Sequence, residues 1–340
     1  MTFNLPPVLY NAKGEIRKAG FELEFSNVGV EDSVRLIQEL YGGRVHRENR
    51  FLQRVLDTRI GDFTVEFDLR LLTEKKYKQP FDSLNIDLQG IKLGESTLEE
   101  SVEAVLESVV GKLFPYEIVT PPVPCTELAQ FEKLRQALHD SNAKGTEAFP
   151  TNVFGTHINV EVPDGQAGTI LRYLQAFLLL YPWLLEKGET DLARRMSPFI
   201  NPYPDEYVQR VLSPGYGPDL DGLIADYHQY SPDRNRPLDL YPLFAALHPQ
   251  QIAAFTNLGK VKARETFHYR LPNSSVSQPG WTLAQEWNLW VVIEELANDP
   301  EKMARMGEAY LALKKDTLIG FGGKWTKQID QWLSLRNAAK

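Results

Sequence analysis

Four short segments of this chain alternate apolar residues with residues that can ionise or bind a cation. They are residues 21–25 (FELEF), 63–68 (FTVEFD), 157–162 (HINVEV) and 267–271 (FHYRL). Successive side chains of a β-strand point to opposite faces, so each segment reads as a strand with one apolar and one polar face. The polar faces carry Glu22 and Glu24; Thr64, Glu66 and Asp68; His157, Asn159 and Glu161; and His268 and Arg270.

If these strands are neighbours, their polar faces gather carboxylates on one surface. Like charges directly across a sheet repel, and crowded carboxylates either take up protons or hold a cation. Oxygen ligands with one or two imidazoles suit a divalent ion such as Mg²⁺ or Mn²⁺. None of the four polar faces carries a lysine, which a solvent-facing strand would usually include. We therefore predict that these glutamates face a metal ion.

A simpler interpretation of each strand stays open. Each one alone could be an ordinary strand with its polar face in water, because periodicity does not show which strands are neighbours. Glu66 could pair with an arginine of a partner strand, such as Arg54, and His157 could be a structural histidine. The combination of the four faces, and no single one of them, favours a metal site.

Composition excludes several other classes of protein. The chain has 340 residues, of which 43% are hydrophobic, and its net charge is −8, so a nucleic-acid-binding surface is not expected. The N-terminus lacks a signal-peptide pattern, and the most apolar segment, 173–186, is too short to span a membrane. We therefore expect a cytoplasmic protein. The lone Cys125 cannot form an intrachain disulfide and is interpreted as a spare thiol.

The order of the predicted elements indicates how the chain positions these faces. Strand and helix patterns alternate without repeats or long linkers, so we expect a single α+β domain over residues 1–340. Its sheet should be mostly antiparallel, with helices on one face. A tyrosine-rich stretch at 198–242 either forms a rim for a substrate or packs between helices. The expected divisions are sheet strands within about 18–163 and 262–272, a helical insertion at about 166–258, and C-terminal helices at about 281–338.

The order of five motifs resembles that of a known family. GFELEF, VEFD, YEIVTPP, GTHINVEV and FHYRLP follow one another between about residues 20 and 295 as in the amidoligases. These enzymes belong to the glutamine synthetase and glutamate–cysteine ligase superfamily of carboxylate–amine ligases. The resemblance implies a curved antiparallel sheet of the glutamine synthetase catalytic-domain type, which binds ATP and divalent metals.

The resemblance also implies roles for individual residues. The metal ligands would be Glu22, Glu24, Glu117 and His157. Besides binding metal, His157 would hold nucleotide phosphate. Arg270, with Arg264, would neutralise phosphate charge. Asp68 would lie near the substrate. Either Asp68 or Glu161 would take the proton from the amine.

Two positions depart from the family pattern. Asn159 stands where many members carry a second histidine, and its carbonyl oxygen could still bind a metal. His268 stands where the late strand often has glutamate. An imidazole in place of a carboxylate weakens one metal site or changes its metal. Glu265 does not obviously substitute, because it lies on the opposite side of a period-two strand.

The function expected from the resemblance is amide-bond formation that depends on ATP and on Mg²⁺ or Mn²⁺. An acyl phosphate would link a small carboxylate to a small amine, an amino acid or a peptide. A glutamine amidotransferase could supply ammonia as a partner. Two alternatives stay open: a metal-dependent hydrolase that uses the same acidic cleft, and a non-catalytic relative that binds a nucleotide or another ligand. The sequence does not indicate the substrates or the oligomeric state.

Overall fold

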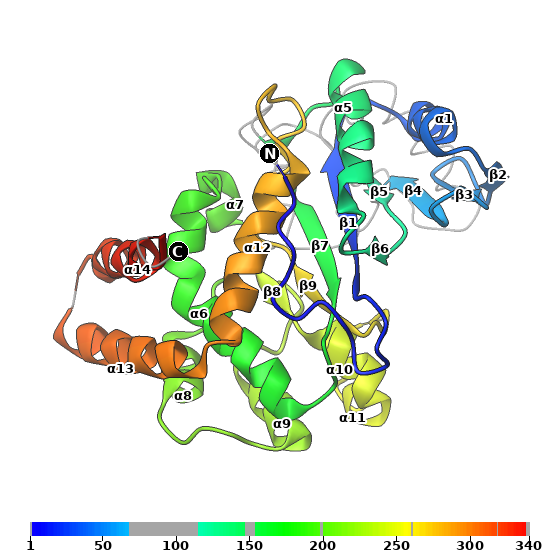
Figure 1. Cartoon of the computed structure of the whole chain (residues 1–340). Coiled ribbons are helices and arrows are strands. Elements are labelled where there is room, and N and C mark those ends of the chain that lie inside the picture. The colour runs from blue at the N-terminus through cyan, green and yellow to red at the C-terminus, as the bar shows by residue number, and fades with distance from the viewer. Residues whose placement is uncertain are drawn as a thin grey trace, which may run out of the picture.

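Alternating side chains give the central sheet a buried apolar face, and helices cover that face (Figure 1). The computed structural model describes residues 2–67, 115–146, 154–197, 200–259, 261–317 and 319–337. Within these residues nine strands form one sheet, and its strand pairs are antiparallel. The predicted α+β class with a large, mostly antiparallel sheet is confirmed.

The first strand in the sequence, β1 (Lys18–Phe25), lies in the middle of the sheet. The order across the sheet is β2-β3-β4-β5-β1-β7-β9-β8, and β6 pairs with one end of β1. Segments far apart in the sequence therefore flank β1 on both sides. The other strands are β2 (Arg44–Arg47), β3 (Leu52–Leu56), β4 (Phe63–Phe67), β5 (Tyr116–Val119), β6 (Val123–Pro124), β7 (Thr156–Glu161), β8 (Leu238–Asp239) and β9 (Thr266–Tyr269).

The helices form a layer on the apolar face and a second layer outside it. Figure 1 shows α6 and α12 side by side, with α13 and α14 beyond them. At the other end of the sheet α1 packs on β3 and β4. The helices are α1 (Val30–Tyr41), α5 (Glu132–Asp140) with the short 3₁₀ helix η3 (Leu128–Phe131) before it, α6 (Ala167–Lys187), α7 (Leu192–Met196), α8 (Asp205–Leu212), α9 (Leu220–Tyr230), α10 (Tyr241–Leu247), α11 (Pro249–Ala253), α12 (Leu283–Ala297), α13 (Pro300–Asp316) and α14 (Phe321–Asn337).

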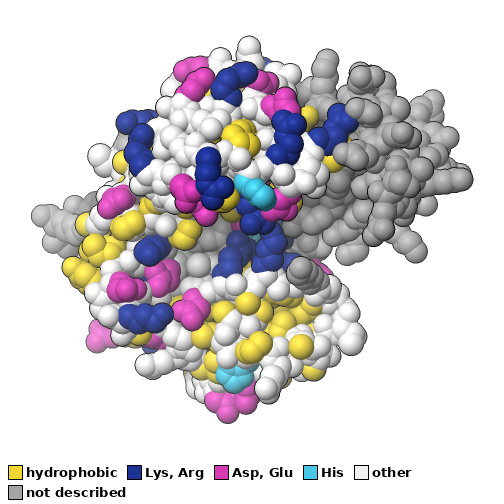
Figure 2. Space-filling view, turned by 90° about the vertical axis from the view of Figure 1, so that its right-hand side faces the viewer, with side chains coloured by type: hydrophobic (Ala, Val, Ile, Leu, Met, Phe, Trp, Pro, Cys, Tyr) yellow, Lys and Arg dark blue, Asp and Glu magenta, His cyan; other side chains and the backbone are white. Residues whose placement is uncertain are grey.

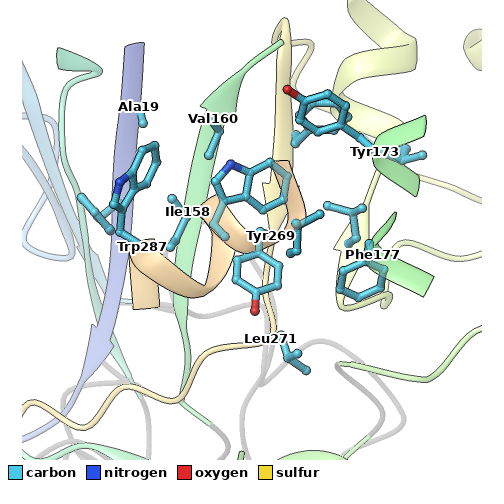
Figure 3. Packing of buried hydrophobic residues seen from close by; sticks show 14 of the residues in the cluster. Ala19, Ile158, Val160, Tyr173, Phe177, Tyr269, Leu271 and Trp287 are labelled. Carbon is cyan, nitrogen blue, oxygen red and sulfur yellow. The ribbon is translucent and has the colours of Figure 1, made fainter. Parts of the chain in front are cut away.

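Large aromatic side chains fill the space between the strands and these helices. Tyr173 of α6 stacks on Phe267 of β9, with ring centroids 4.7 Å apart. Trp290 of α12 lies 5.5 Å from both Phe267 and Tyr269. Figure 3 shows Tyr173, Tyr269 and Trp287 in this layer. Burial of each such ring stabilises the fold by about 1.5–3 kcal/mol, so the apolar face holds the sheet rigid behind its polar face.

A fully buried ion pair fastens α12 to the start of β1. Arg17 donates from Nη1 and Nη2 to the two carboxylate oxygens of Glu294, both at 2.8 Å, and neither side chain is exposed. Trp290 Nε1 and Tyr173 Oη donate to the same carboxylate at 2.7 and 3.1 Å. Removing two charges from water costs several kcal/mol per ion, so this pair depends on its full set of hydrogen bonds.

The stretch expected to be a helical insertion contains one strand that periodicity did not predict. The strand β8 is only two residues long, yet it pairs with β9 at the edge of the sheet. Two residues show no alternation to detect. The tyrosine-rich stretch packs inward between helices, as the second interpretation expected: Tyr203 and Tyr227 are buried, with ring centroids 6.0 Å apart.

The ion pair generates a stability prediction. Glu294→Gln removes one charge and leaves Arg17 buried beside a neutral amide, so the free energy of unfolding should fall by about 3–5 kcal/mol. Urea denaturation measures this change. The control Asp205→Asn breaks the exposed pair with Lys314 and should cost no more than about 1 kcal/mol. A loss below 1 kcal/mol for Glu294→Gln would contradict the prediction.

Candidate functional site

Three carboxylates lie in a row where β4, β5 and β1 pair. Glu66 stands directly opposite Glu117, and Glu117 directly opposite Glu24. Opposite residues of an antiparallel pair share one face with their Cβ atoms about 5 Å apart, so ionised glutamates there repel one another. Arg54, the alternative partner considered for Glu66, forms its ion pair with Glu48 at 2.9 Å. The row therefore favours a bound cation.

On the other side of β1, imidazoles stand opposite the carboxylates. Glu22 lies opposite His157, while His268 lies opposite Asn159 on one side and Asp239 on the other. All five side chains are buried. Strand register thus gathers residues from six strands on one surface, which we call the polar wall: Glu66, Glu117, Glu24, Glu22, His157, Asn159, His268 and Asp239.

The carboxylate of Glu22 is the centre of the polar wall. Its Oε1 accepts hydrogen bonds from Asn159 Nδ2 at 2.9 Å and from Arg264 Nη1 at 2.8 Å. Its Oε2 lies 2.8 Å from His157 Nδ1 and 3.4 Å from His268 Nε2. One oxygen is therefore satisfied by fixed donors, and the other is hydrogen-bonded to His157 and also faces the imidazole of His268.

Burial and neighbouring groups set the protonation of these residues. Burial lowers the pKa of His157 to about 3, so its imidazole is neutral at neutral pH. Burial alone would raise the pKa of Glu22, but the imidazoles of His268 and His157 hold it well below its usual value. Burial also opposes ionisation of Asp239, yet His268 and Arg234 lower its pKa. Ionised carboxylates beside neutral imidazole are the protonation states that metal ligands require.

Two groups on the polar wall have the spacing of a cation site. The first is Glu22, His157 and His268, and the second is Glu24, Glu117 and His157; in each group the ligand atoms lie within 4.8 Å of one another. The imidazole of His157 lies between them, since Nδ1 is 2.8 Å from Glu22 and Nε2 is 3.7 Å from Glu24. A neutral imidazole has one lone pair, so His157 can bind a metal in only one group at a time.

Arginines border the polar wall. Besides Arg264, which bonds Glu22, Arg270 donates from Nη1 to the carbonyl oxygen of Arg234 at 2.9 Å. The Nε atoms of Arg264 and Arg270 are buried and have no hydrogen-bond partner among the described residues. Figure 2 shows basic side chains gathered beside acidic ones in a hollow of one face of the molecule. Buried N–H donors without partners are suited to an anionic ligand.

A further arginine, Arg194 of α7, explains the glycine of the GTHINVEV motif. Arg194 is buried and donates to the carbonyl oxygen of Arg270 at 2.7 Å. A Cβ atom at Gly155 would lie 2.6 Å from its Nη2, so a larger residue there would displace the buried guanidinium. The backbone N–H of Gly155 in turn donates to Glu24 Oε2 at 2.7 Å. The motif therefore places a cation and a hydrogen-bond donor next to a predicted metal ligand.

The structure gathers most of the residues predicted for the site. Glu22, Glu24, Glu117 and His157 meet on the polar wall, Arg264 bonds Glu22, and Arg270 lies close enough to lower the pKa of His157. Their roles as ligands and phosphate binders stay predictions.

Of the two predicted proton acceptors, Glu161 is not part of this assembly. The carboxylate of Glu161 accepts hydrogen bonds from Asn11 Nδ2 and from the backbone N–H of Lys18, each at 2.8 Å. Both of its oxygens are thus occupied at the far end of β7. Asp68 lies outside the described residues.

Sequence reasoning missed Asp239 and Arg194. Asp239 lies in the RPLDLYPLF stretch that contributed to the resemblance, so a signal was present without an assigned role. Arg194 belongs to LARRM, a short segment that reads as the charged surface of a helix, and no local pattern distinguishes it.

A separate cavity lies at the N-terminal end of α12. Its volume is about 650 Å³, and its lining includes Trp281, Glu286 and Asn273. Glu286 accepts a hydrogen bond from Trp281 Nε1 at 2.9 Å, whereas its Oε2 has no partner among the described residues. Burial raises the pKa of Glu286 to about 7. This carboxyl group is therefore largely protonated below neutral pH.

Two other sequence-based interpretations can be compared with the structure. Cys125 is buried, and burial raises the pKa of its thiol to about 12, so this thiol does not form a nucleophilic thiolate at neutral pH. Within the described parts of the chain, none of the helices has both the length and the apolar composition that a membrane span requires.

The polar wall lies inside a region that matches a known protein family. Residues 15–292 match the model of the family described as "putative amidoligase enzyme". This range includes every strand of the described sheet. No curated protein and no solved structure gives a significant match to the chain.

The carboxylate row generates a prediction about cation binding. MgCl₂ at 100 times its dissociation constant should raise the free energy of unfolding by about 2.7 kcal/mol, because the ion binds only the folded chain. Glu117→Gln should abolish the increase, and the exposed control Glu127→Gln should retain it. Thermal unfolding with and without MgCl₂ measures both. An equal increase in all three proteins would exclude Glu117 as a ligand.

Glu286 generates a prediction about pH. Its pKa is about 7 in the fold and 4.5 ordinarily, so its stabilising contribution is complete below pH 4.5 and is lost as the pH rises through 7. Wild type and Glu286→Gln should have similar free energies of unfolding at pH 5. At pH 8 wild type should be less stable by about 3 kcal/mol. Denaturation curves at both values test this, with Glu301→Gln as an exposed control whose difference from wild type stays constant.

Proposed function

Because the chain belongs to the amidoligase family of enzymes, we propose that it joins a carboxylate to an amine at the polar wall, with ATP and divalent cations. The observation that supports this site is the convergence of Glu22, Glu24, Glu117 and His157 from three strands within reach of shared cations. We extend the proposal to the fold: the open antiparallel sheet with helices on one face corresponds to the glutamine synthetase catalytic-domain type.

The proposed reaction has two steps. An ionised carboxylate does not react with an amine in water, so the γ-phosphoryl group of ATP is first transferred to a carboxylate oxygen, which forms an acyl phosphate and ADP. The amine then attacks the acyl carbon, the C–N bond forms, the C–O bond breaks, and inorganic phosphate leaves. Divalent cations bound at the polar wall would supply positive charge against the phosphate oxygens.

The ionised glutamates would bind anionic reactants through cations, and the neighbouring arginines would bind them directly. Two negatively charged reactants must approach a surface that itself carries carboxylates, so the carboxylates need cations between them and the substrate. The arginines act directly, because the buried Nε donors of Arg264 and Arg270 lack partners among the described residues. A donor that is fixed in a buried site stabilises developing charge without reorganisation.

The acceptor of the amine proton stays a prediction. Asp68 and Glu161 were the two candidates, and the hydrogen bonds from Asn11 and Lys18 to Glu161 favour Asp68. The substrates also belong to the proposal at the level of class only: a small carboxylate, and an amine, amino acid or peptide. Where the amine is ammonia, a glutamine amidotransferase is the partner that we propose.

An isotope-transfer experiment tests the acyl phosphate. Purified protein is incubated with ATP, MgCl₂ or MnCl₂, a panel of ¹⁸O-labelled amino-acid carboxylates, and ammonia or hydroxylamine. The expected result is ¹⁸O in inorganic phosphate and a hydroxamate when hydroxylamine replaces ammonia. Arg270→Gln should lower kcat on the order of 100-fold or more, because a charge-stabilising donor is lost. The control Arg210→Gln removes an exposed arginine that pairs with Asp226 and should keep the wild-type kcat.

Three outcomes would overturn the proposal, and the last two favour a different function. If ATP is hydrolysed and the carboxylate is consumed, but no ¹⁸O appears in inorganic phosphate, the acyl phosphate is excluded. Metal-dependent cleavage of amides or esters without nucleotide indicates a hydrolase. Failure to bind both nucleotide and divalent metal indicates a non-catalytic relative of the ligases.

A further inference from the structure

The two cation groups of the polar wall differ in chemistry. Glu24 and Glu117 offer oxygen atoms, which suit Mg²⁺ together with water and substrate phosphate. Glu22, His157 and His268 offer one oxygen and two imidazole nitrogens. Imidazole suits zinc, iron, cobalt and nickel ions, and Mg²⁺ binds it poorly. The set of Glu22, His157 and His268 should therefore select a different metal from that of Glu24 and Glu117.

His268 has the geometry of a ligand that lacks its partner. The side chain is buried, Nε2 lies 3.4 Å from Glu22 Oε2, and Nδ1 lies 3.5 Å from Asp239 Oδ2. Neither nitrogen forms a hydrogen bond with any described residue. Buried polar atoms are normally paired, so a nitrogen held in this position without a partner points to a bound group that completes it.

Asp239 orients the imidazole of His268. It is fully buried, its Oδ1 accepts a hydrogen bond from the backbone N–H of Tyr241 at 3.0 Å, and its Oδ2 faces His268 Nδ1. With a cation between Nε2 and Glu22, a neutral imidazole keeps its proton on Nδ1, where the carboxylate of Asp239 faces it. The lone pair is then on Nε2, the nitrogen that faces Glu22. Histidines that bind metals commonly have a carboxylate in this position.

The distances around Glu22 fit a small ion. A metal with bonds of about 2.0–2.2 Å holds neighbouring ligand atoms about 3.0–3.5 Å apart. The 3.4 Å between Glu22 Oε2 and His268 Nε2 lies within this range. The 2.8 Å between Oε2 and His157 Nδ1 is a hydrogen bond, which a metal would replace with a slightly longer spacing. Asn159 and Arg264 already occupy the other oxygen, so Oε2 is the one that can bind.

We propose that Glu22, His157 and His268 form a site for a first-row transition ion such as Zn²⁺, Co²⁺ or Fe²⁺, with Asp239 as its positioning residue. His157 binds through Nδ1, and its Nε2–H then faces Glu24. Mg²⁺ is left to the oxygen ligands Glu24 and Glu117. The inference rests on the proposed function, since it divides the cations of that reaction between two sites.

Metal titrations of the full-length protein test the site. Chelator-treated protein is titrated with CoCl₂, ZnCl₂ and MgCl₂ by calorimetry, and bound Co²⁺ is followed by its visible absorption. Wild type should bind one Co²⁺ or Zn²⁺ at least 10-fold more tightly than Mg²⁺. His268→Glu should weaken Co²⁺ and Zn²⁺ binding at least 10-fold, strengthen Mg²⁺ binding, and change the Co²⁺ spectrum.

Asp239→Asn tests the positioning role. It should weaken Co²⁺ and Zn²⁺ binding 10–100-fold, as loss of such a hydrogen-bonding carboxylate does elsewhere, and leave Mg²⁺ binding unchanged. The control is Asp221→Asn, which alters a second aspartate–histidine pair: Asp221 lies 2.8 Å from His248, and its side chain is exposed. Circular dichroism verifies that each variant folds. If Asp239→Asn does not fold, His268→Gln, which removes the imidazole that Asp239 orients, is titrated in its place.

The possible failures are distinguishable. If Mg²⁺ binds as tightly as Co²⁺ and His268→Glu changes neither, the transition-metal site is excluded while the proposed ligase remains possible. If Co²⁺ binding survives Asp239→Asn unchanged, the positioning role is excluded. If wild type binds no divalent ion, with or without ATP, the metal requirement of the proposed function fails as well.

Discussion

An ionised carboxylate in a buried position is the constraint on which the polar wall depends. Glu22 lies in the central strand, and an unpaired charge there would cost several kcal/mol, so the surrounding strands must supply donors. Asn159 and Arg264 satisfy one oxygen, and the other faces His157 and His268. The neighbouring strands β7 and β9 thus both contribute side chains that contact the carboxylate of Glu22. A cation bound to that oxygen would take the place of its hydrogen bond with His157 and of its longer contact with His268.

The apolar face also contains a buried carboxylate, but the hydrogen bonds of this one are complete. Glu294 is held by a bidentate arginine and by the donors of Trp290 and Tyr173. Such a carboxylate has no remaining capacity for a ligand, and its role is to fix α12 on the sheet. On the polar wall, in contrast, nitrogen atoms of His268, Arg264 and Arg270 remain without partners among the described residues. The difference between complete and incomplete pairing separates a structural charge from a candidate functional one.

Local periodicity predicted the two faces of each strand but could not give their arrangement. The alternation in FELEF or HINVEV depends on burial of one face, which nearest neighbours in the sequence reveal. Which strands pair depends on contacts across the whole chain, so the resemblance and not the pattern indicated that Glu22 and His157 meet. Asp239 was missed because its strand has two residues, and Arg194 because a buried arginine on a short helix has the same sequence signature as an exposed one.

The central position of β1 also affects when the polar wall can form. Glu22 and its partner Arg264 are 242 positions apart, and β9 is the last strand of the sheet in the sequence. A contact between residues so far apart in the sequence closes a long loop. The loss of chain entropy on loop closure opposes formation of the contact, so such contacts form late in folding. During synthesis on the ribosome, Glu22 emerges long before the arginine that compensates its charge. The first half of the nascent chain therefore carries an acidic strand that has to stay hydrated until the last strand arrives.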